Sequence, residues 1–251
     1  MPGFVGVSPV VAGGRPPPRG RRGTGCDDVG VSSLSDLLHR RDDPSLPFIT
    51  FDDRRTGERV ELSGTTTANW VAKTANFLTD DLDAEPGTRV RIGLPAHWLR
   101  YVWVLSCWTV GATVAEGSAD IGLSGPDLRA DEPERLAASL RPLGARFAEP
   151  PTGFVDIGAE VPGHGDVFVA LDPPQGSTAA VDLPDLVATH DELLASATSC
   201  PDRVLTTPGT LAEDVRLLVD VLVGGGSVVL ATGADDATMA TIAVQERAVR
   251  R

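Results

Sequence analysis

The sequence predicts an α/β fold made of two similar, mostly parallel sheets with covering helices. Residues 89–115 follow the order strand, helix, strand, which places two parallel strands side by side beneath a helix. Residues 203–230 repeat this order with the same spacing between an Arg-Val pair and a later glycine. A chain of 251 residues with 41% apolar and 23% charged side chains can bury a core around such sheets.

The first ordered elements precede these two units. Leu34–Leu38 has the spacing of a short amphipathic helix, and residues 48–51 and 59–62 predict two strands around a polar turn. Apolar side chains then recur at helical spacing over residues 68–82, and Pro86-Gly87 ends that stretch. A helix and a hairpin are therefore expected before the first βαβ unit.

The first βαβ unit contains the most apolar segment of the chain. Residues 90–94 and 113–115 predict its strands, and residues 98–108 predict a helix that is apolar on nearly every side. Such a helix is expected between two layers, with Gly111 at its end. Its four aromatic side chains are expected in the core, with a ligand cavity as the alternative, and Cys107 is expected to be an inert buried thiol.

Between residues 118 and 188 the pattern weakens into short apolar pieces broken by Pro and Gly. Order then returns with a helix, the second βαβ unit and a final helix from about residue 234. That final helix is expected to end in Arg247, Arg250 and Arg251, because basic side chains favour a helix C-terminus. The other elements expected there are a helix at 191–197, a strand at 203–205, a helix at 211–222 and a strand at 227–230.

The sequence also predicts a boundary near residue 30. Residues 1–25 contain four arginines and no acidic residue, and Pro and Gly are frequent among them. This composition predicts a disordered basic extension over residues 1–30. Residues 31–251 are expected to form one α/β domain with halves at about 31–170 and 171–251.

Charge and composition narrow the functional classes. With 35 acidic and 22 basic residues the net charge is -13, which argues against a nucleic-acid partner. The longest uncharged, mostly apolar run covers residues 101–115, and a membrane span needs about 20 residues, so no membrane partner is expected. Three separated cysteines and four scattered histidines predict neither a disulfide framework nor a metal site. A cytoplasmic protein is expected.

Four short motifs occur in the order known from one family. Residues 86–95 read PGTRVRIGLP, a long apolar helix follows, and residues 111–114 read GATV. Further on, residues 189–194 read THDELL and residues 224–230 read GGGSVVL. This set resembles the N-terminal domain of the adenylate-forming, AMP-binding superfamily, which includes acyl-CoA synthetases, luciferases and peptide-synthetase adenylation domains. The resemblance covers about residues 45–235 and implies a truncated form of that domain, in a short, uncharacterised branch from high-GC bacteria.

The resemblance implies where a nucleotide would bind. In the superfamily a loop with the signature TSG[ST]TGxPKG wraps the phosphates of ATP just before the T-H motif. This chain has GSTAAVDLPD at residues 176–185, in which Gly176, Ser177 and Thr178 match the signature. A later glycine is replaced by alanine and the lysine by Asp185. The blocked backbone approach and the reversed charge predict that this vestigial phosphate loop repels ATP.

Two other positions have competing interpretations. His190 matches the T-H motif and is expected at the former substrate side, with a role at the start of the helix beside Thr189 as the alternative. Residues 63–67 read SGTTT and imitate the phosphate loop, but they begin a helix and no Pro-Lys follows, so they predict a helix cap. No catalytic residue and no metal ligand is expected.

Three functional hypotheses remain open. The first is a non-catalytic relative, a pseudoenzyme, of the AMP-dependent acyl-CoA synthetases that binds a small molecule or acts as a scaffold for a protein partner, without a cofactor. The second is a synthetase-like enzyme, an AMP-forming acid–thiol ligase, that uses ATP and is active only with a partner chain. The third is a carrier that keeps an acyl pocket between its two halves. The altered loop at residues 176–185 favours the first.

Overall fold

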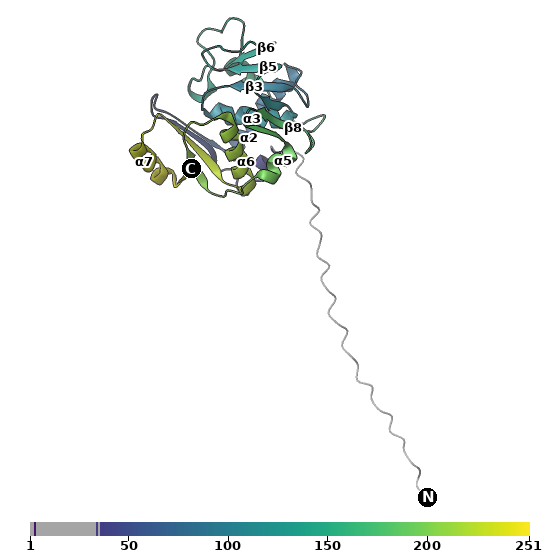
Figure 1. Ribbon diagram of the computed structural model, residues 1–251, viewed down its shortest axis with the longest axis vertical. Helices are drawn as coiled ribbons and strands as arrows, with labels where there is room; N and C mark the ends of the chain where they lie inside the picture. The colour runs from purple at the N-terminus through teal and green to yellow at the C-terminus, as the bar shows by residue number, and fades with distance from the viewer. Residues whose placement is uncertain (1–2, 4–33, 35) are drawn as a thin grey trace. The chain divides into compact units, whose positions relative to one another are not determined.

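The computed structural model describes residues 3, 34 and 36–251, which contain two β-sheets and the helices that cover them (Figure 1). Apart from residue 3, the extension expected over residues 1–30 lies outside this description. The elements in chain order are α1 (Asp36–His39), β1 (Pro47–Asp53), β2 (Glu58–Ser63), α2 (Gly64–Asp80), β3 (Arg89–Gly93), α3 (Trp98–Val110), β4 (Thr113–Ala115), β5 (Ile121–Ser124), β6 (Glu134–Ala137), the single-turn 3₁₀ helix η1 (Pro142–Gly144), β7 (Val155–Asp156), α4 (Ile157–Glu160), the 3₁₀ helix η2 (Val161–Gly163), β8 (Ala179–Leu183), β9 (Leu186–Thr189), α5 (His190–Ser196), β10 (Arg203–Thr206), α6 (Leu211–Gly224), β11 (Ser227–Thr232), α7 (Asp236–Glu246) and β12 (Val249–Arg250).

The strand pairing confirms the α/β prediction of two mostly parallel sheets. One sheet has seven strands in the order β7-β6-β5-β3-β4-β8-β9, and the other has five in the order β12-β10-β11-β1-β2. The pairs β1–β2 and β8–β9 are antiparallel, and the remaining neighbours are parallel. The chain begins in the five-stranded sheet, builds the seven-stranded one and then returns. Each sheet therefore contains strands that precede residue 170 and strands that follow it.

Both expected βαβ units are present. In the first, β3 and β4 pair in parallel with Val90 opposite Val114, and α3 connects them. In the second, β10 and β11 pair in parallel with Val204 opposite Val228, and α6 connects them. Helix α3 contacts β1 of one sheet and β3 and β4 of the other, so it lies between the sheets (Figure 1).

The core is centred on α3, as its apolar surface predicts. All but one of its residues are buried, and it ends at Gly111, whose φ of 81° is left-handed and suits glycine. Burial raises the pKa of the Cys107 thiol to about 12, in agreement with an inert thiol. The aromatic residues expected in the core are each at most 1% exposed: Trp98, Tyr101, Trp103 and Trp108.

The end of the chain differs from the prediction. The last helix does not continue to the terminal arginines: α7 ends at Glu246, and Arg247 turns the backbone with a left-handed φ of 50°. The N–H of Ala248 then donates to the Ala243 carbonyl at 2.9 Å, and Val249 pairs with Val204 in the short parallel strand β12. The expectation was wrong because strand pairing with β10 outweighs the charge preference at a helix end.

Helix α7 covers the face of the five-stranded sheet that is directed away from the main core. Its side chains Met239 and Ile242 pack there on Leu205, Val229 and Ala231 in a small separate cluster. Figure 1 shows α7 at the outer side of this sheet, away from α3. The sheet is therefore covered on both faces, as parallel strands usually are.

The segment with the weak pattern contains several strands that the sequence analysis did not identify. Strands β5 and β6 are parallel neighbours, yet no helix connects them. Their irregular connection is fixed by an ion pair between Arg91 and the buried Glu132, and by the Arg129 N–H, which donates to the Ser124 hydroxyl at 2.7 Å. Without a helix in the crossover, the usual periodic signal of a βαβ unit is missing here.

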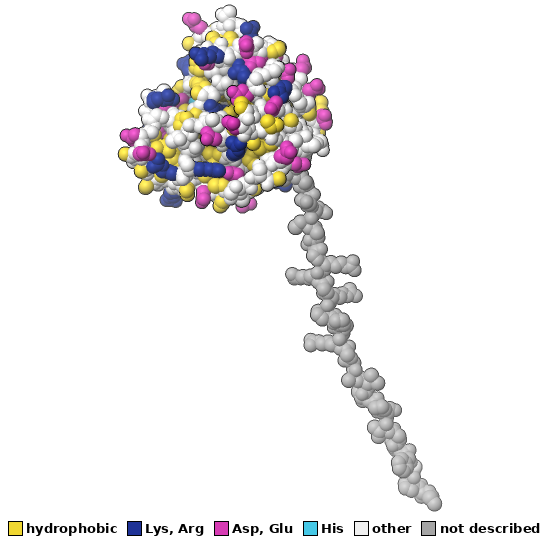
Figure 2. All heavy atoms as spheres, viewed as in Figure 1, with side chains coloured by type: hydrophobic (Ala, Val, Ile, Leu, Met, Phe, Trp, Pro, Cys, Tyr) yellow, Lys and Arg dark blue, Asp and Glu magenta, His cyan; other side chains and the backbone are white. Residues whose placement is uncertain are grey.

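The surface of the described part carries charges of both signs. On the face seen in Figure 2, basic side chains are dispersed among acidic and hydrophobic ones rather than gathered in one region. None of the helices in the described part of the chain combines the length and the hydrophobicity needed to cross a membrane.

Candidate functional site

The segment 176–178, expected as a vestigial phosphate loop, is a turn directly before β8. The Thr178 N–H donates to the Gln175 carbonyl at 2.9 Å, and the Gln175 N–H donates to the Thr178 hydroxyl at 3.0 Å. Ser177, at the tip of the turn, is exposed. The amide and the hydroxyl of Thr178 are thus engaged inside the turn itself.

The carbonyl groups of this turn point to the start of α5. The Gly176 carbonyl accepts from the Asp191 N–H at 2.9 Å, and the Thr178 carbonyl accepts from the His190 N–H at 3.1 Å. A Cβ atom added to Gly176 would overlap the Asp191 carboxylate, so an acidic side chain lies directly against this glycine. Oxygen atoms and a negative charge therefore lie where a phosphate would need N–H donors.

The remainder of the segment that matches the phosphate-loop signature is a β-hairpin. Residues 179–183 form β8, which pairs in parallel with β4 on one side and antiparallel with β9 on the other. Leu183 lies opposite Leu186, so only Pro184 and Asp185 connect the two strands. Backbone N–H groups that donate within two strand ladders are not available to wrap an anion.

The two acidic residues of the segment have different environments. The Asp182 carboxylate forms an ion pair with Arg89 of β3 at 2.8 Å, which compensates its charge. Asp185 is exposed at the hairpin turn, where its backbone carbonyl accepts from the Arg216 guanidinium. Among the described residues no ion pair involves the Asp185 carboxylate. An anion that approaches the hairpin turn therefore meets the Asp185 carboxylate together with the Arg216 guanidinium.

His190 is fully buried at the start of α5. Thr189 caps this helix together with Glu192, whose carboxylate accepts from the Thr189 N–H at 2.8 Å. The His190 Nδ1 accepts from the Leu34 N–H at 3.3 Å, and its ring meets the Trp108 ring edge-on at a centroid distance of 6.4 Å. Loss of solvation lowers the pKa of His190 to about 4. The ring is neutral, and because Nδ1 accepts, its proton is on Nε2.

A buried polar cluster between α3 and α6 was not identified from the sequence. Arg100 and Asp214 form a buried ion pair, and the Tyr101 hydroxyl donates to Asp214 Oδ1 at 3.0 Å. The Arg100 guanidinium also donates to the carbonyl groups of Leu94 at 2.7 Å and Gly209 at 3.1 Å. Burial raises the pKa of Asp214, although Arg100 acts in the opposite direction, and burial also raises the pKa of Tyr101.

Two features of the sequence could have indicated this cluster. Arg100 is the one charged residue of α3, and a charge in a buried helix requires a partner. Asp214 lies on the same helix face as Leu218 and Val221, which are both fully buried. An acid in an apolar stripe and a base in an apolar helix together indicate a buried ion pair.

A groove of about 430 Å³ lies beside this cluster, at the carboxyl end of β10. It is lined by the loop of residues 206–209, by the first turns of α6 including Asp214, and by Arg251. In parallel α/β sheets, ligands bind beyond the carboxyl ends of the strands. This groove is therefore the candidate small-molecule site of the described chain.

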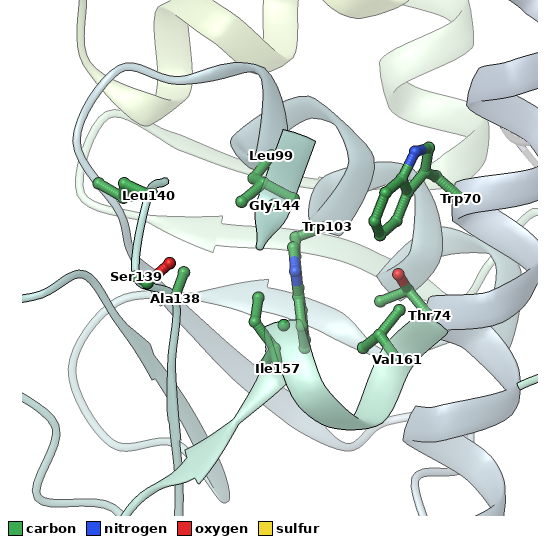
Figure 3. Close-up of a pocket in the computed structure, with 11 residues that line it drawn as sticks. Trp70, Thr74, Leu99, Trp103, Ala138, Ser139, Leu140, Gly144, Ile157 and Val161 are labelled. Atoms are coloured by element: carbon green, nitrogen blue, oxygen red, sulfur yellow. The ribbon is translucent and has the colours of Figure 1, made fainter. Parts of the chain in front are cut away.

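A smaller cavity lies beneath the loop of residues 138–144. Figure 3 shows Trp103 in the middle of its lining, with Ile157 on one side and Thr74 and Val161 on the other. Its free volume is about 10 Å³, which corresponds to at most one water molecule. The aromatic side chains fill this site themselves, so it has no room for an acyl chain.

The helix-cap interpretation of residues 63–67 is confirmed. The Ser63 hydroxyl accepts from the Thr66 N–H at 3.1 Å and caps the start of α2. In the described part of the chain, no group of three or more His, Cys, Asp or Glu side chains could hold a metal ion.

Solved structures with a similar fold are acyl-CoA synthetases. The acyl-CoA synthetase of Brucella canis has a TM-score of 0.72 at 14% identity, with 90% of this chain and 48% of that chain covered. A fatty acyl-CoA synthetase of Mycobacterium tuberculosis has a TM-score of 0.65 at 14% identity, with 86% and 48% covered. The inhibitor-bound N-terminal domain of FACL13 from Mycobacterium tuberculosis has a TM-score of 0.64 at 14% identity, with 86% and 61% covered. At this identity the likeness shows the fold, and this chain spans about half the length of the two synthetases.

Sequence comparison identifies a nearer relative. No family model matches the chain. A curated protein of Mycobacterium tuberculosis (strain ATCC 25618 / H37Rv), described as a TIGR03089 family protein, is 34% identical over 228 residues. The match covers 84% of this chain and 93% of that protein. The chain, which has the fold of the N-terminal domain of acyl-CoA synthetases, therefore belongs to the TIGR03089 family.

Proposed function

We propose that this protein is a non-catalytic relative of the AMP-dependent acyl-CoA synthetases that acts in the cytoplasm as a small-molecule-binding or scaffold protein. The observation that carries the proposal is the β8–β9 hairpin. Residues 176–185 resemble the phosphate-binding signature, and half of them form a strand with a neighbouring strand on each edge. Without a flexible, N–H-lined loop, neither the positioning nor the electrostatic stabilisation of a reacting triphosphate is available there.

The charges near the hairpin support the same proposal. Asp191 lies against Gly176, and Asp185 is exposed at the turn without an ion-pair partner among the described residues. At a separation of about 4 Å and an effective dielectric constant of about 20, two like charges repel by about 4 kcal/mol. A triphosphate carries several negative charges, so each of these two carboxylates, which lie beyond opposite ends of β8, makes its approach less favourable.

The groove beside Asp214 supports the binding role. Its volume of about 430 Å³ is in the range of small-molecule sites, and both polar and apolar side chains line it. It lies at the end of β10 and does not include the β8–β9 hairpin. Loss of nucleotide binding at the hairpin would therefore leave this groove intact.

The proposal is tested by calorimetric titration of the full chain with ATP–Mg²⁺ and by a pyrophosphate-exchange assay with fatty and aromatic acids. We expect no saturable heat at millimolar ATP and no exchange above a heat-denatured control. Saturable binding that is lost in Ser177→Ala and Thr178→Ala would contradict the proposal and favour the ligase that works with a partner chain.

A second variant separates geometry from charge. Asp185→Lys restores the positive charge of the family signature but leaves the hairpin in place. We expect this variant to bind no ATP, because residues 179–183 remain a strand that pairs with β9 and, at Val181 and Asp182, with β4. If Asp185→Lys gains saturable ATP binding, charge alone was the obstacle and the argument from the hairpin is wrong.

A further inference from the structure

An extended segment before β8 exposes a row of apolar side chains, here called the apolar row. It consists of Val167, Val169 and Leu171, which are 73%, 76% and 99% exposed. Phe168, between them, packs against the main core, so alternate side chains point outward. The segment pairs with no strand of the described chain, and no hydrogen bond within the described residues uses the N–H groups of residues 167–171. The segment is not itself a strand, and its backbone bends at Leu171, but the unused N–H groups of residues 167–170 and the alternating side chains leave it open to pairing with an added strand.

Helix α2 holds the start of this segment in place. The amide of Asn76 donates to the carbonyl groups of Gly165 at 2.9 Å and Val167 at 3.0 Å. The ammonium group of Lys73 donates to the carbonyl groups of Pro162, at 3.3 Å, and His164. Because the backbone is already fixed here, less conformational entropy is lost when a partner binds.

A groove of about 380 Å³ adjoins the apolar row. Its lining includes Ala68 and Ala72 of α2 on one side and Asp166 and Val167 on the other. Asp166 is the one carboxylate among the lining residues. A long basic side chain fits this arrangement, with its aliphatic part along the alanines and its charge at Asp166.

The charges around the apolar row indicate the sign of the partner. Asp166 precedes the row and Asp172 follows it, both exposed and without ion-pair partners among the described residues. A second copy of this chain, paired antiparallel through the same segment, would bring Asp166 opposite Asp172 of its neighbour. Like charges in that position are destabilising. A partner with basic residues at both ends of its strand avoids this repulsion.

We propose that the apolar row and its adjoining groove bind an extended segment of a partner protein, with alternating apolar side chains and Lys or Arg at both ends. The partner lies as a strand beside residues 167–170, whose N–H groups form no hydrogen bond within the described residues, so backbone hydrogen bonds supply affinity and the alternate side chains supply specificity. The surface lies outside the β8–β9 hairpin, and the inference therefore holds whether or not the hairpin binds a nucleotide.

The test selects, from a random library of displayed peptides about ten residues long, those that bind the full chain. The affinity of each selected peptide for the protein is then measured by fluorescence anisotropy. We expect selected peptides to alternate apolar residues and to carry basic residues at both ends. Val169→Thr should weaken their binding at least tenfold, because it places a hydroxyl in the apolar row. Val244→Thr, at a valine of α7 that is 80% exposed, is the matched control and should leave the affinity unchanged.

A second pair of variants tests the charges. Asp166→Asn and Asp172→Asn should weaken basic-ended peptides and reduce the salt dependence of their binding. Selection of no common pattern, selection of acidic-ended peptides, or equal affinity for Val169→Thr and Val244→Thr would overturn the proposal. Self-association of the chain that Val169→Thr abolishes would also overturn it, because the occupant would then be a second copy.

Discussion

Arg100 and Asp214 connect the two βαβ units through a single buried ion pair. Arg100 is 8% exposed and Asp214 is 3% exposed, so removal of one partner leaves the other charge without solvent or counter-ion. Asp214→Ala should therefore lower the free energy of unfolding by about 3–5 kcal/mol. Urea denaturation followed by circular dichroism measures this change.

The matched control for that prediction is Asp236→Ala. Asp236 forms an ion pair with Arg250 at 2.8 Å, but its side chain is 97% exposed. Exposed pairs of this kind contribute little, so the control should leave the urea midpoint almost unchanged. Similar losses in both variants would contradict the buried role of the Arg100–Asp214 pair.

Two buried histidines make the stability of the fold depend on pH. His97 caps α3, with its Nδ1 accepting from the Leu99 N–H at 3.3 Å, and burial lowers its pKa to about 4, as it does for His190. In the unfolded chain the reference pKa is 6.5, so the unfolded state binds more protons between these values. The contribution of these two histidines to stability is therefore fully present above pH 6.5 and is lost as the pH falls towards about 4.

His190→Gln tests this dependence, because it removes one of the two titrating groups. Between pH 6.5 and about 4, the slope of the unfolding free energy against pH should decrease. The decrease corresponds to at most one proton fewer taken up on unfolding. Glutamine can also change the stability at every pH, so the slope and not the absolute value is the readout. A slope equal to that of the unchanged protein would show that His190 titrates normally in the fold.

The glycines that end α6 show how an element-level motif serves the fold. Gly225 has a left-handed φ of 76° and forms the helix C-cap, whereas Gly224 lies directly against the backbone of Cys200. A Cβ atom on Gly224 would overlap that backbone, which cannot move aside as a flexible side chain can. Close packing therefore accounts for Gly224 in the GGGSVVL motif, and helix capping accounts for Gly225.

Gly224→Ala should destabilise the protein by about 2 kcal/mol or more, because overpacking against backbone forces a shift of the helix. Gly163→Ala is the control: a Cβ there meets no atom within 4 Å, and its φ is not left-handed. Thermal unfolding of both variants checks the difference. If Gly163→Ala lowered the melting temperature as much as Gly224→Ala, close approach at Cys200 would not be the cause.

Some elements of this fold can be predicted from the sequence and others cannot. The β3-α3-β4 and β10-α6-β11 units were predictable, because long apolar helices and β-branched strands give distinct periodic patterns. Strands β5, β6 and β7 have two to four residues each and no α-helix between them, so they carry no such pattern. The strand β12 depends on pairing with β10, a long-range contact that no local signal reveals.

The candidate site was predictable only in part. Gly176, Ser177 and Thr178 match the family signature, but these residue types do not indicate that the next five residues form a strand. That strand pairs with β9 along most of its length and with β4 at Val181 and Asp182. The ion pair of Arg100 and Asp214 joins residues on different helices, and only its two unusual charges point to it. Both the β8 strand and the ion pair depend on contacts between residues far apart in the sequence. A single sequence carries no local signal for such contacts.

At the scale of the whole molecule, the fold resembles the N-terminal domain of acyl-CoA synthetases, and half of the segment that resembles the phosphate-loop signature lies in a sheet. Strands β8 and β9 form one edge of the seven-stranded sheet, and β8 comes from this stretch of the chain. The same stretch packs against α5 through Gly176 and Thr178. Opening this segment into a phosphate-binding loop would therefore remove strand pairing and helix contacts that the fold uses.

The central claim is tested most directly by amide hydrogen exchange of residues 179–183 in the full chain, with and without ATP–Mg²⁺ at millimolar concentration. If β8 is a strand paired on both edges, its amides exchange slowly, and ATP leaves their rates unchanged. Rapid exchange of these amides in the free protein, or protection that appears only when ATP is added, would show a nucleotide-binding loop and contradict the account.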